Sequence, residues 1–391
     1  MSGPPAAGLP ATLMRGGTRK AVFLHSRHLP TDSRERDRWL ARLLGSPDPG
    51  ARQLDGLGGA HALTSRVVLV GRSLRDDCDV DVLFGSVDPR SGALDWSGGE
   101  ADLVAAAGVF ALLEGLHPVT EGVSRVRVWH GATRGRVDAL VPVREGRVLE
   151  DGAFLEEGVP FGSAEIRLEF LDPDDGGRGG SLLPSGAVSD RIEVPGLGEV
   201  VLSVLGGGWP AVFVRSASLG LNGRETLAAL AQERRLRSRA QAILQAVDSR
   251  FGASRGQVQA ALPSAGAPTL IWVAPPAAYR STSGAEVVAG DVDLLARAWS
   301  DGQVVAAAGA GVSVAIGVAA ALPGTLVNEI ARTLPGVPTR IGHPAGPAAV
   351  GAELASRDGQ WRVDKVVLSH GARRLMSGVV HCPPASFPRP A

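Results

Sequence analysis

The residues best suited to chemistry stand at the start of a predicted helix. Residues 95–116 open with a turn at Ser97-Gly98-Gly99 and continue as Ala, Val, Leu and Phe with almost no polar face. Glu100 and Asp102 fall in the first helical turn, where free backbone amides and the helix dipole favour acidic groups. A helix that is apolar all round is buried. Its polar start is therefore predicted to hold an anion or to carry acid–base chemistry, with simple helix capping as the alternative.

Glycine-rich turns form a second group of candidate features. Gly16-Gly17-Thr18, the loop 56–59 and Ser185-Gly186 could present backbone amides to carboxylate or carbonyl oxygens. Each turn alone is also consistent with a structural role. The prediction that their backbone amides bind a ligand's oxygens therefore depends on all of the turns taken together. His61 follows one of these loops, and His343 stands in a loop shaped by glycine and proline. Both histidines are candidates for facing a pocket.

The sequence contains no recognisable cofactor or metal motif. The glycine loops match neither a P-loop nor a dinucleotide-binding fingerprint. Two cysteines, Cys78 and Cys382, are too few for a disulfide framework and have no metal-ligand spacing. We therefore expect neither a cofactor nor a metal. Four further histidines are predicted at the surface: His25, His28, His117 and His130.

The elements that must position these residues repeat along the chain. The run GGTRKAVFLHSRHL at 16–29 resembles GGGWPAVFVRSASL at 206–219, and VAAAG occurs at 104–108 and 305–309. Each half also has short alternating strands and one uncharged helix, predicted at 102–116 and 304–322. The sequence predicts an α+β fold of two similar domains, each a curled, mostly antiparallel sheet around a buried helix. We place the domains at 1–182 and 183–391, with the last strands able to return to the first domain.

Composition narrows the class of protein. The 391 residues carry a net charge of zero with no basic stripe, so nucleic acid is not an expected partner. Residues 304–322 are too rich in Ala and Gly for a membrane span, and the N-terminus lacks the features of a signal peptide. We expect a cytoplasmic monomer or homodimer that binds a small molecule. Residues 292–300 are predicted to be helical.

Taken in order, the motifs resemble the 2-methylaconitate cis-trans isomerase and 4-oxalomesaconate tautomerase family, which has the diaminopimelate-epimerase-like fold. The matching runs span nearly the whole chain and include MRGGTRKAVF, DGLGGAHALTSR, DWSGG, STSG, GHPAG and ARRLMSG. The resemblance implies two similar domains with the active site in the cleft between them. The predicted substrate-binding residues are Arg15, Gly16, Gly17, Thr18, Gly59, His61, Thr64, Ser65, Asp102, Ser185, Gly186, Ser281, Ser283 and His343.

The chain departs from the family pattern where the resemblance implies catalysis. Arg66 replaces the family's proton-transferring Lys, and Glu100 replaces a Cys in the pattern Ser-Gly-Asn-Cys-Gly-Asn. Arg19 replaces a Ser. An Arg stays protonated at working pH, so Arg66 cannot abstract a proton as Lys can. We predict Arg66 and Glu100 as the catalytic pair, a fixed cation and a carboxylate facing each other across the ligand.

Three functions are consistent with these residues. The first is cyclisation, rearrangement or isomerisation of a larger conjugated substrate in a secondary-metabolite pathway, driven by shape and electrostatics. The second is double-bond isomerisation of a small di- or tricarboxylate, with Glu100 as base and Arg66 as carboxylate clamp. The third is a non-catalytic homologue that binds a ligand or partner. The sequence favours the first and does not name the substrate.

Overall fold

The computed structural model describes residues 8–61, 63–98, 101–173, 181–259, 268–300, 302–334, 336–357 and 359–381. Glu100, predicted to be catalytic, lies outside the described residues, as does Cys382.

The first half of the chain wraps strands around helix α2 (Asp102–Leu113). Every residue of α2 from Asp102 to Leu112 is buried, as expected for a helix with no polar face. Small side chains let strands approach closely: a Cβ on Gly108 would lie only 2.7 Å from the Cβ of Ala139 in a neighbouring strand. Helix α1 (Ser33–Leu43) packs outside this layer. The strands are β1 (Leu9–Gly16), β2 (Arg19–His25), β3 (Arg66–Arg72), β4 (Val80–Val87), β5 (Leu94–Asp95), β6 (Gly122–His130), β7 (Gly135–Arg144), β8 (Arg147–Val148) and β9 (Glu165–Leu171).

The second half repeats the arrangement around helix α5 (Ala310–Ala321). A Cβ on Gly317 would lie 2.7 Å from Val350, so this helix also uses a glycine to approach a strand. The second half contains three further helices, α3 (Leu227–Gln232), α4 (Leu236–Gln259) and α6 (Leu326–Ile330). The strands are β10 (Asp190–Val194), β11 (Gly198–Leu205), β12 (Ala211–Arg215), β13 (Thr269–Ala274), β14 (Tyr279–Arg280), β15 (Glu286–Val287), β16 (Leu294–Ser300), β17 (Gln303–Val304), β18 (Thr339–His343) and β19 (Gly346–Arg357).

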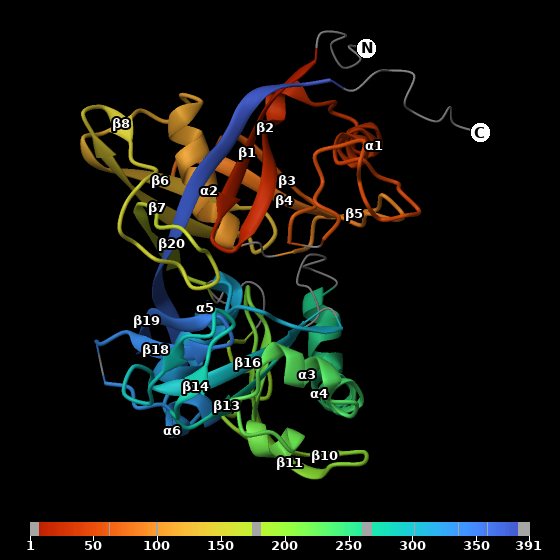
Figure 1. The fold of residues 1–391 in the computed structure, drawn as a ribbon. Coiled ribbons are helices and arrows are strands. Elements are labelled where there is room, and N and C mark those ends of the chain that lie inside the picture. The colour runs from red at the N-terminus through yellow and green to blue at the C-terminus, as the bar shows by residue number, and fades with distance from the viewer. Residues whose placement is uncertain are drawn as a thin grey trace.

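Strand β20 (Gln360–Val380) joins the two halves. It pairs antiparallel with β19 over its first part and with β9 and β1 farther along. Figure 1 shows it as the blue ribbon that rises from the lower part of the molecule across the upper part. The pairings between named strands are mostly antiparallel, with parallel pairs such as β2–β3 and β12–β13. The α+β fold class predicted from the sequence is confirmed.

The segments that match in sequence form matching elements. The run at 16–29 makes the β1–β2 turn, β2 and a 3-10 helix at Ser26–His28, and the run at 206–219 makes the β11–β12 turn, β12 and a 3-10 helix at Ser216–Leu219. The VAAAG match, however, is misleading. Residues 104–108 lie within α2, whereas 305–309 precede α5. A division near residue 182 stays a prediction, since the buried residues around α2 and α5 form one continuous cluster.

Three sequence predictions are wrong in detail. Helix α5 begins at Ala310 rather than 304, because Gly309 has an extended ψ of 168° and Gln303–Val304 pairs as β17 with β16. Residues 294–300 form strand β16, not a helix; its residues are nearly all buried, and periodicity does not distinguish a short buried strand from a helix. His130 is 0% exposed rather than at the surface, because β6 carries it into the core beside Phe84.

Candidate functional site

The N-termini of the two central helices meet at Asp102. This residue begins α2, and its Oδ1 accepts a hydrogen bond of 2.5 Å from the backbone N–H of Ala310, the first residue of α5. Its side chain is 2% exposed. Two glycines leave room for it: a Cβ on Gly17 would lie 2.8 Å from Asp102 Cβ, and one on Gly309 would lie 2.8 Å from Oδ1. Glycine turns from both halves therefore enclose one carboxylate.

Donors and cations surround the Asp102 carboxylate. Thr18 Oγ1 donates to Oδ2 at 3.2 Å, Arg19 Nε lies 3.5 Å from Oδ2, and His370 Nε2 lies 3.9 Å from Oδ1. Burial acts to raise the pKa of Asp102, but Arg19, His370, the Ala310 amide and Thr18 together hold that pKa below its usual value. Asp102 is therefore ionised at neutral pH. Arg19 and Asp102 form an ion pair.

A second buried ion pair adjoins the first. His370 Nδ1 hydrogen-bonds Glu156 Oε1, and Glu156 Oε2 accepts the N–H of Gly371 at 2.9 Å and faces Arg15 Nη1 at 3.4 Å. Burial acts to lower the pKa of His370, but the carboxylates of Glu156 and Asp102 raise that pKa above its usual value, against the opposing charge of Arg15. These carboxylates thus favour the protonated, cationic form of the imidazole. Opposite charges alternate along the row Arg15, Glu156, His370, Asp102 and Arg19.

The turn between β1 and β2 brings the first group of predicted residues together. Arg15 Nη1 donates to the carbonyls of Gly17 at 2.9 Å and Gly371 at 3.1 Å, which ties the turn to β20. Gly16 packs on the first turn of α2: a Cβ there would lie 2.9 Å from Ala106 Cβ and 3.0 Å from Asp102 O. The structure therefore brings together five of the predicted residues, namely Arg15, Gly16, Gly17, Thr18 and Asp102. Their role in binding a substrate stays a prediction.

The loop before β3 is held by a residue that the sequence did not single out. Gln53 Oε1 accepts from the Ser65 hydroxyl at 2.6 Å and from the Ala60 N–H at 2.8 Å. The Ser65 hydroxyl is therefore engaged within the protein. Thr64 packs over Gly59, where a Cβ would lie 2.3 Å from Thr64 Oγ1.

His61 and Arg66 bound this loop in different environments. His61 is exposed, and its Nδ1 accepts from the Leu63 N–H at 3.1 Å. Arg66 opens β3 and is only 6% exposed, so it is a buried cation rather than an ordinary surface arginine. Its predicted position opposite Glu100 stays a prediction, because Glu100 lies outside the described residues.

The predicted residues of the second half form a separate group. Ser281 Oγ lies 2.8 Å from Ser283 Oγ, the Thr282 N–H donates to Pro344 O at 2.8 Å, and Tyr279 OH donates to His343 O at 2.7 Å. His343 is buried, and burial, helped by Arg297, lowers its pKa to about 3. Its imidazole is neutral at physiological pH and accepts the Ala345 N–H at 3.2 Å. These contacts fix His343 within its own loop, and its predicted role in substrate binding stays a prediction.

This second group reaches the first through the loop that carries Glu156. A Cβ on Gly346 would lie 2.3 Å from the carboxyl of Glu157, and one on Gly158 would lie 3.5 Å from Ala345 and 3.7 Å from Thr18. Residues 156–158 therefore separate the Thr18 turn from the His343 loop. Burial raises the pKa of the Glu157 carboxyl.

Ser185 and Gly186 are not brought to this site. Ser185 Oγ donates to Asp190 Oδ2 at 2.6 Å within its own turn. The nearby Val188 packs against Gly324, beyond the C-terminal end of α5. Val188 thus packs near the C-terminal end of α5, whereas Asp102 contacts Ala310 at its N-terminal end.

Sequence reasoning missed Glu156 and His370. Neither stands in a recognisable motif, and the contact joins residues 214 positions apart in the chain. It forms only because β20 returns to β9 and places His370 opposite Ile166. The antiparallel return of the last strand, which the sequence left open, was the one available signal.

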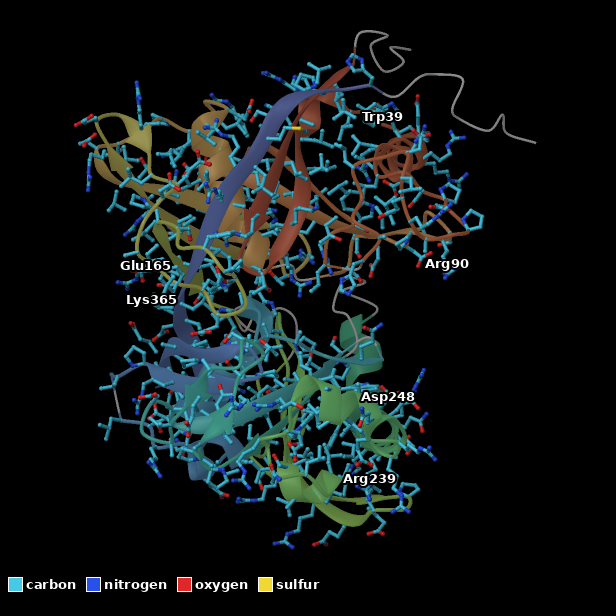
Figure 2. The ribbon with its side chains drawn as sticks, in the orientation of Figure 1. Trp39, Arg90, Glu165, Arg239, Asp248 and Lys365 are labelled. Atoms are coloured by element: carbon cyan, nitrogen blue, oxygen red, sulfur yellow. The ribbon has the colours of Figure 1, made fainter. Side chains whose placement is uncertain are left out.

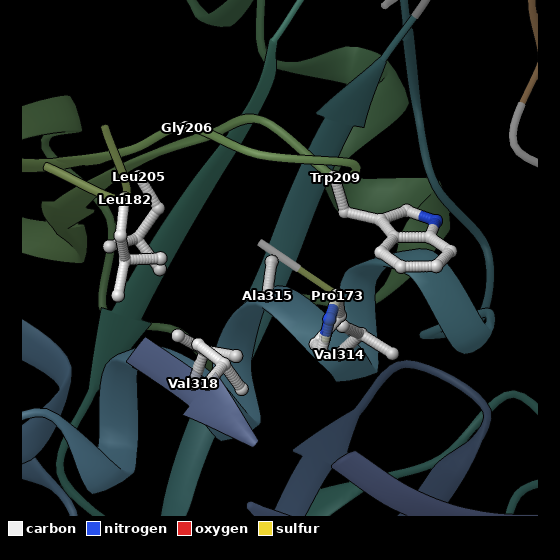
Figure 3. A pocket seen from close by; sticks show the side chains of 9 residues that line it. Pro173, Leu182, Leu205, Gly206, Trp209, Val314, Ala315 and Val318 are labelled. Carbon is white, nitrogen blue, oxygen red and sulfur yellow. The ribbon is translucent and has the colours of Figure 1, made fainter. Parts of the chain in front are cut away.

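The described ranges contain no group of three or more His, Cys, Asp or Glu placed to hold a metal ion. Within those ranges no helix is long and apolar enough to cross a membrane. A small hollow lies beside α5, lined by residues such as Leu182, Leu205, Trp209 and Val318 (Figure 3). It offers about 10 Å³, roughly the space of one water, and is too small for a substrate.

Comparison with solved structures defines the class of fold. A hydroxyproline epimerase from Agrobacterium vitis aligns with a TM-score of 0.55 at 13% identity, over 96% of this chain and 94% of that one. A methylitaconate-delta-isomerase aligns with a TM-score of 0.81 at 30% identity, over 98% of this chain and 99% of that one. The chain thus has the fold shared by epimerases and racemases of this type.

Sequence comparison is more specific. The sequence model of the PrpF protein family matches residues 7–383, and the chain belongs to that family. A 2-methyl-aconitate isomerase of Shewanella oneidensis is 39% identical over 97% of this chain and 98% of its own length. A 3-methylitaconate isomerase of Eubacterium barkeri is 33% identical over 95% of this chain and 97% of its own. The resemblance stated from the motifs is confirmed, and the protein is an enzyme of an isomerase family.

Proposed function

We propose that the protein isomerises a carbon–carbon double bond in a small polycarboxylate. The observation that carries the proposal is the buried carboxylate site where the two helix N-termini meet, surrounded by Thr18, Arg19 and His370. Helix N-termini and fixed cations are the groups that bind carboxylates and stabilise developing negative charge. Relatives that match over nearly the full chain are named for 2-methyl-aconitate and 3-methylitaconate, which are small unsaturated acids.

The reaction would be a proton shift along an allylic system. A proton leaves the carbon next to the double bond, the electron pair delocalises toward a carboxylate as a dienolate, and a proton returns at the other end. The cations near the site would stabilise the dienolate. Glu100 remains the proposed base and Arg66 the proposed carboxylate clamp. We propose a cytoplasmic monomer or homodimer.

One observation favours a second candidate. Arg66 is a buried, permanently charged group at the position of the family's Lys, which suits electrostatic rearrangement of a larger conjugated substrate better than proton transfer. The named relatives support the small-carboxylate reaction better, and neither a cyclase nor a secondary-metabolite role has support among them.

A substrate panel tests the proposal. The purified enzyme would be incubated with 2-methylaconitate, 3-methylitaconate and 4-oxalomesaconate, and the isomers would be followed by proton NMR. We expect at least one acid to be isomerised, and Arg19→Ala to raise KM about tenfold or more through loss of a charge-assisted contact. Conversion of none of the acids, together with consumption of a larger conjugated compound, would favour the second candidate.

A further inference from the structure

We propose that Asp102 occupies a carboxylate-binding subsite with its own side chain, so that the substrate is a dicarboxylate and not a tricarboxylate. This inference rests on the proposed function and deepens it. The internal carboxylate stands where a ligand carboxylate would bind, between the first residues of α2 and α5. A substrate then places its own carboxylates on the remaining cations of the site.

The groups around Asp102 are those of a built anion site. One carboxylate oxygen accepts the Ala310 amide at 2.5 Å, and the other accepts the Thr18 hydroxyl at 3.2 Å. A guanidinium, that of Arg19, lies 3.5 Å away. A helix N-terminal amide, a hydroxyl and a guanidinium are each common partners of bound carboxylates. Here α5, the β1–β2 turn and β2 each supply one of these groups, and all three groups face the two carboxylate oxygens of Asp102.

His370 provides an independent indication of a ligand. It is 7% exposed, and its Nε2 is buried without a hydrogen-bond partner among the described residues. Its Nδ1 is fixed by Glu156, so Nε2 has one orientation, toward Asp102 Oδ1 at 3.9 Å. That separation is too long for a hydrogen bond. The site therefore offers one more donor than Asp102 uses, as expected if a free carboxylate fits it better than a tethered one.

The negative charge of Asp102 limits the number of carboxylates that a substrate can carry into the site. Asp102 is ionised and neutralises part of the positive charge of Arg19 and His370. A ligand carboxylate brought to the same place would meet a like charge in a buried setting, where repulsion is strong. The backbone around Gly17 and Gly309 leaves no spare volume, since a single Cβ at either position would come within 2.8 Å of Asp102. The enzyme has room and charge for one carboxylate at this point, and Asp102 supplies it.

Emptying the subsite is the first test. Asp102→Ala and Asp102→Ser remove the carboxylate and open space, whereas Asp102→Asn removes the charge and keeps the volume. Sodium formate, with sodium chloride at equal ionic strength as the salt control, would be titrated against each variant and followed by thermal unfolding. We expect formate to raise the Tm of the Ala and Ser variants by about 2–4 °C at saturating concentration. The Tm of wild type and of Asp102→Asn should not respond.

Equal formate effects on all four proteins would overturn the inference, and so would no effect on any of them. If the Ala and Ser variants fold only when formate is present during expression or refolding, that rescue supports the inference. If they are insoluble with and without formate, the inference is tested instead by the binding of di- and tricarboxylates to Asp102→Asn, described next.

The substrate class is tested by binding, without any need for turnover. Glutarate and tricarballylate are unreactive di- and tricarboxylates, and their affinities would be measured by calorimetry. We expect wild type to bind glutarate at least tenfold more tightly than tricarballylate. Asp102→Asn should reduce that preference for glutarate at least threefold. Wild type that prefers tricarballylate, or binds neither acid, would overturn the inference. Tight glutarate binding without turnover of any acid in the panel would instead refute the proposed function and leave the subsite standing.

Discussion

At the scale of single residues, the site is the row of alternating charges from Arg15 to Arg19, and no sequence motif predicts this row. Arg15 and Asp102 were predicted from a glycine turn and a helix start, and the structure places both in the row. Glu156 and His370 were not predicted, because their roles depend on which distant residue faces them. Local chemistry identified the acidic helix start, and long-range strand pairing supplied its partners.

The raised pKa of His370 predicts a pH dependence of stability. A histidine whose folded-state pKa lies above its ordinary 6.5 stabilises the fold fully below pH 6.5, and loses that contribution as pH rises through the folded-state pKa. Each tenfold gain in proton affinity corresponds to about 1.4 kcal/mol. We therefore expect the free energy of unfolding to fall above pH 6.5, and His370→Gln to remove that decline. Urea titrations from pH 5 to 9 would measure it.

Glu156→Gln should move the same decline to lower pH, because it removes the carboxylate that does most to raise the pKa of His370. Glu165→Gln is the matched control. Glu165 accepts a hydrogen bond from the hydroxyl of Ser369, next to His370 in the chain, and is exposed (labelled in Figure 2). A decline that persists unchanged in His370→Gln would mean that another group titrates.

At the scale of elements, glycines decide how closely helices and turns approach. The sequence located both central helices by composition, but it placed the start of α5 six residues early, since Gly309 was assigned to the helix. It also assigned β16 to a helix, because Leu, Ala and Arg favour helices locally. Pairing with β13 and β18 outweighs that preference. Such pairing is not visible in a local window.

Gly309→Ala tests the contact between the two helix starts. The new Cβ would lie 2.8 Å from Asp102 Oδ1, closer than side chains pack, and should displace the carboxylate from the Ala310 amide. We expect a loss of about 1–3 kcal/mol in stability and a fall in kcat/KM of about tenfold or more. Gly290→Ala is the control, because a Cβ there meets no atom within 4 Å. Equal stability of the two variants would show that the Asp102 contact is dispensable.

At the scale of the whole molecule, the two halves share one buried cluster and one strand. Residues around α2 and α5 belong to the same core, and β20 pairs with strands of both halves. Trp209, in the turn before β12, packs edge-on against Phe170 of β9 at 5.1 Å between ring centroids. The sequence indicated two similar halves from a repeat, but not the contacts between them, since those join residues that have no shared pattern.

The contact of Trp209 with Phe170 therefore predicts that the two halves unfold together. Trp209→Ala should cost about 1–3 kcal/mol, less than deletion of a fully buried aromatic side chain, because Trp209 is only partly buried. Trp209→Phe should cost much less, because the indole N–H has no hydrogen-bond partner among the described residues. We expect wild type to unfold in one transition, with circular dichroism and tryptophan fluorescence coincident. Two separated transitions in wild type would show that the halves unfold independently.

The central claim, a double-bond isomerisation by proton transfer, is tested most directly by the fate of solvent deuterium. The enzyme would convert its acid in deuterated water, and the product would be examined by proton and deuterium NMR. The account predicts deuterium at the allylic carbon of the product, delivered at the rate of turnover. A product formed at that rate with no deuterium on carbon would contradict it, and would show that the enzyme rearranges its substrate without exchanging a proton with solvent.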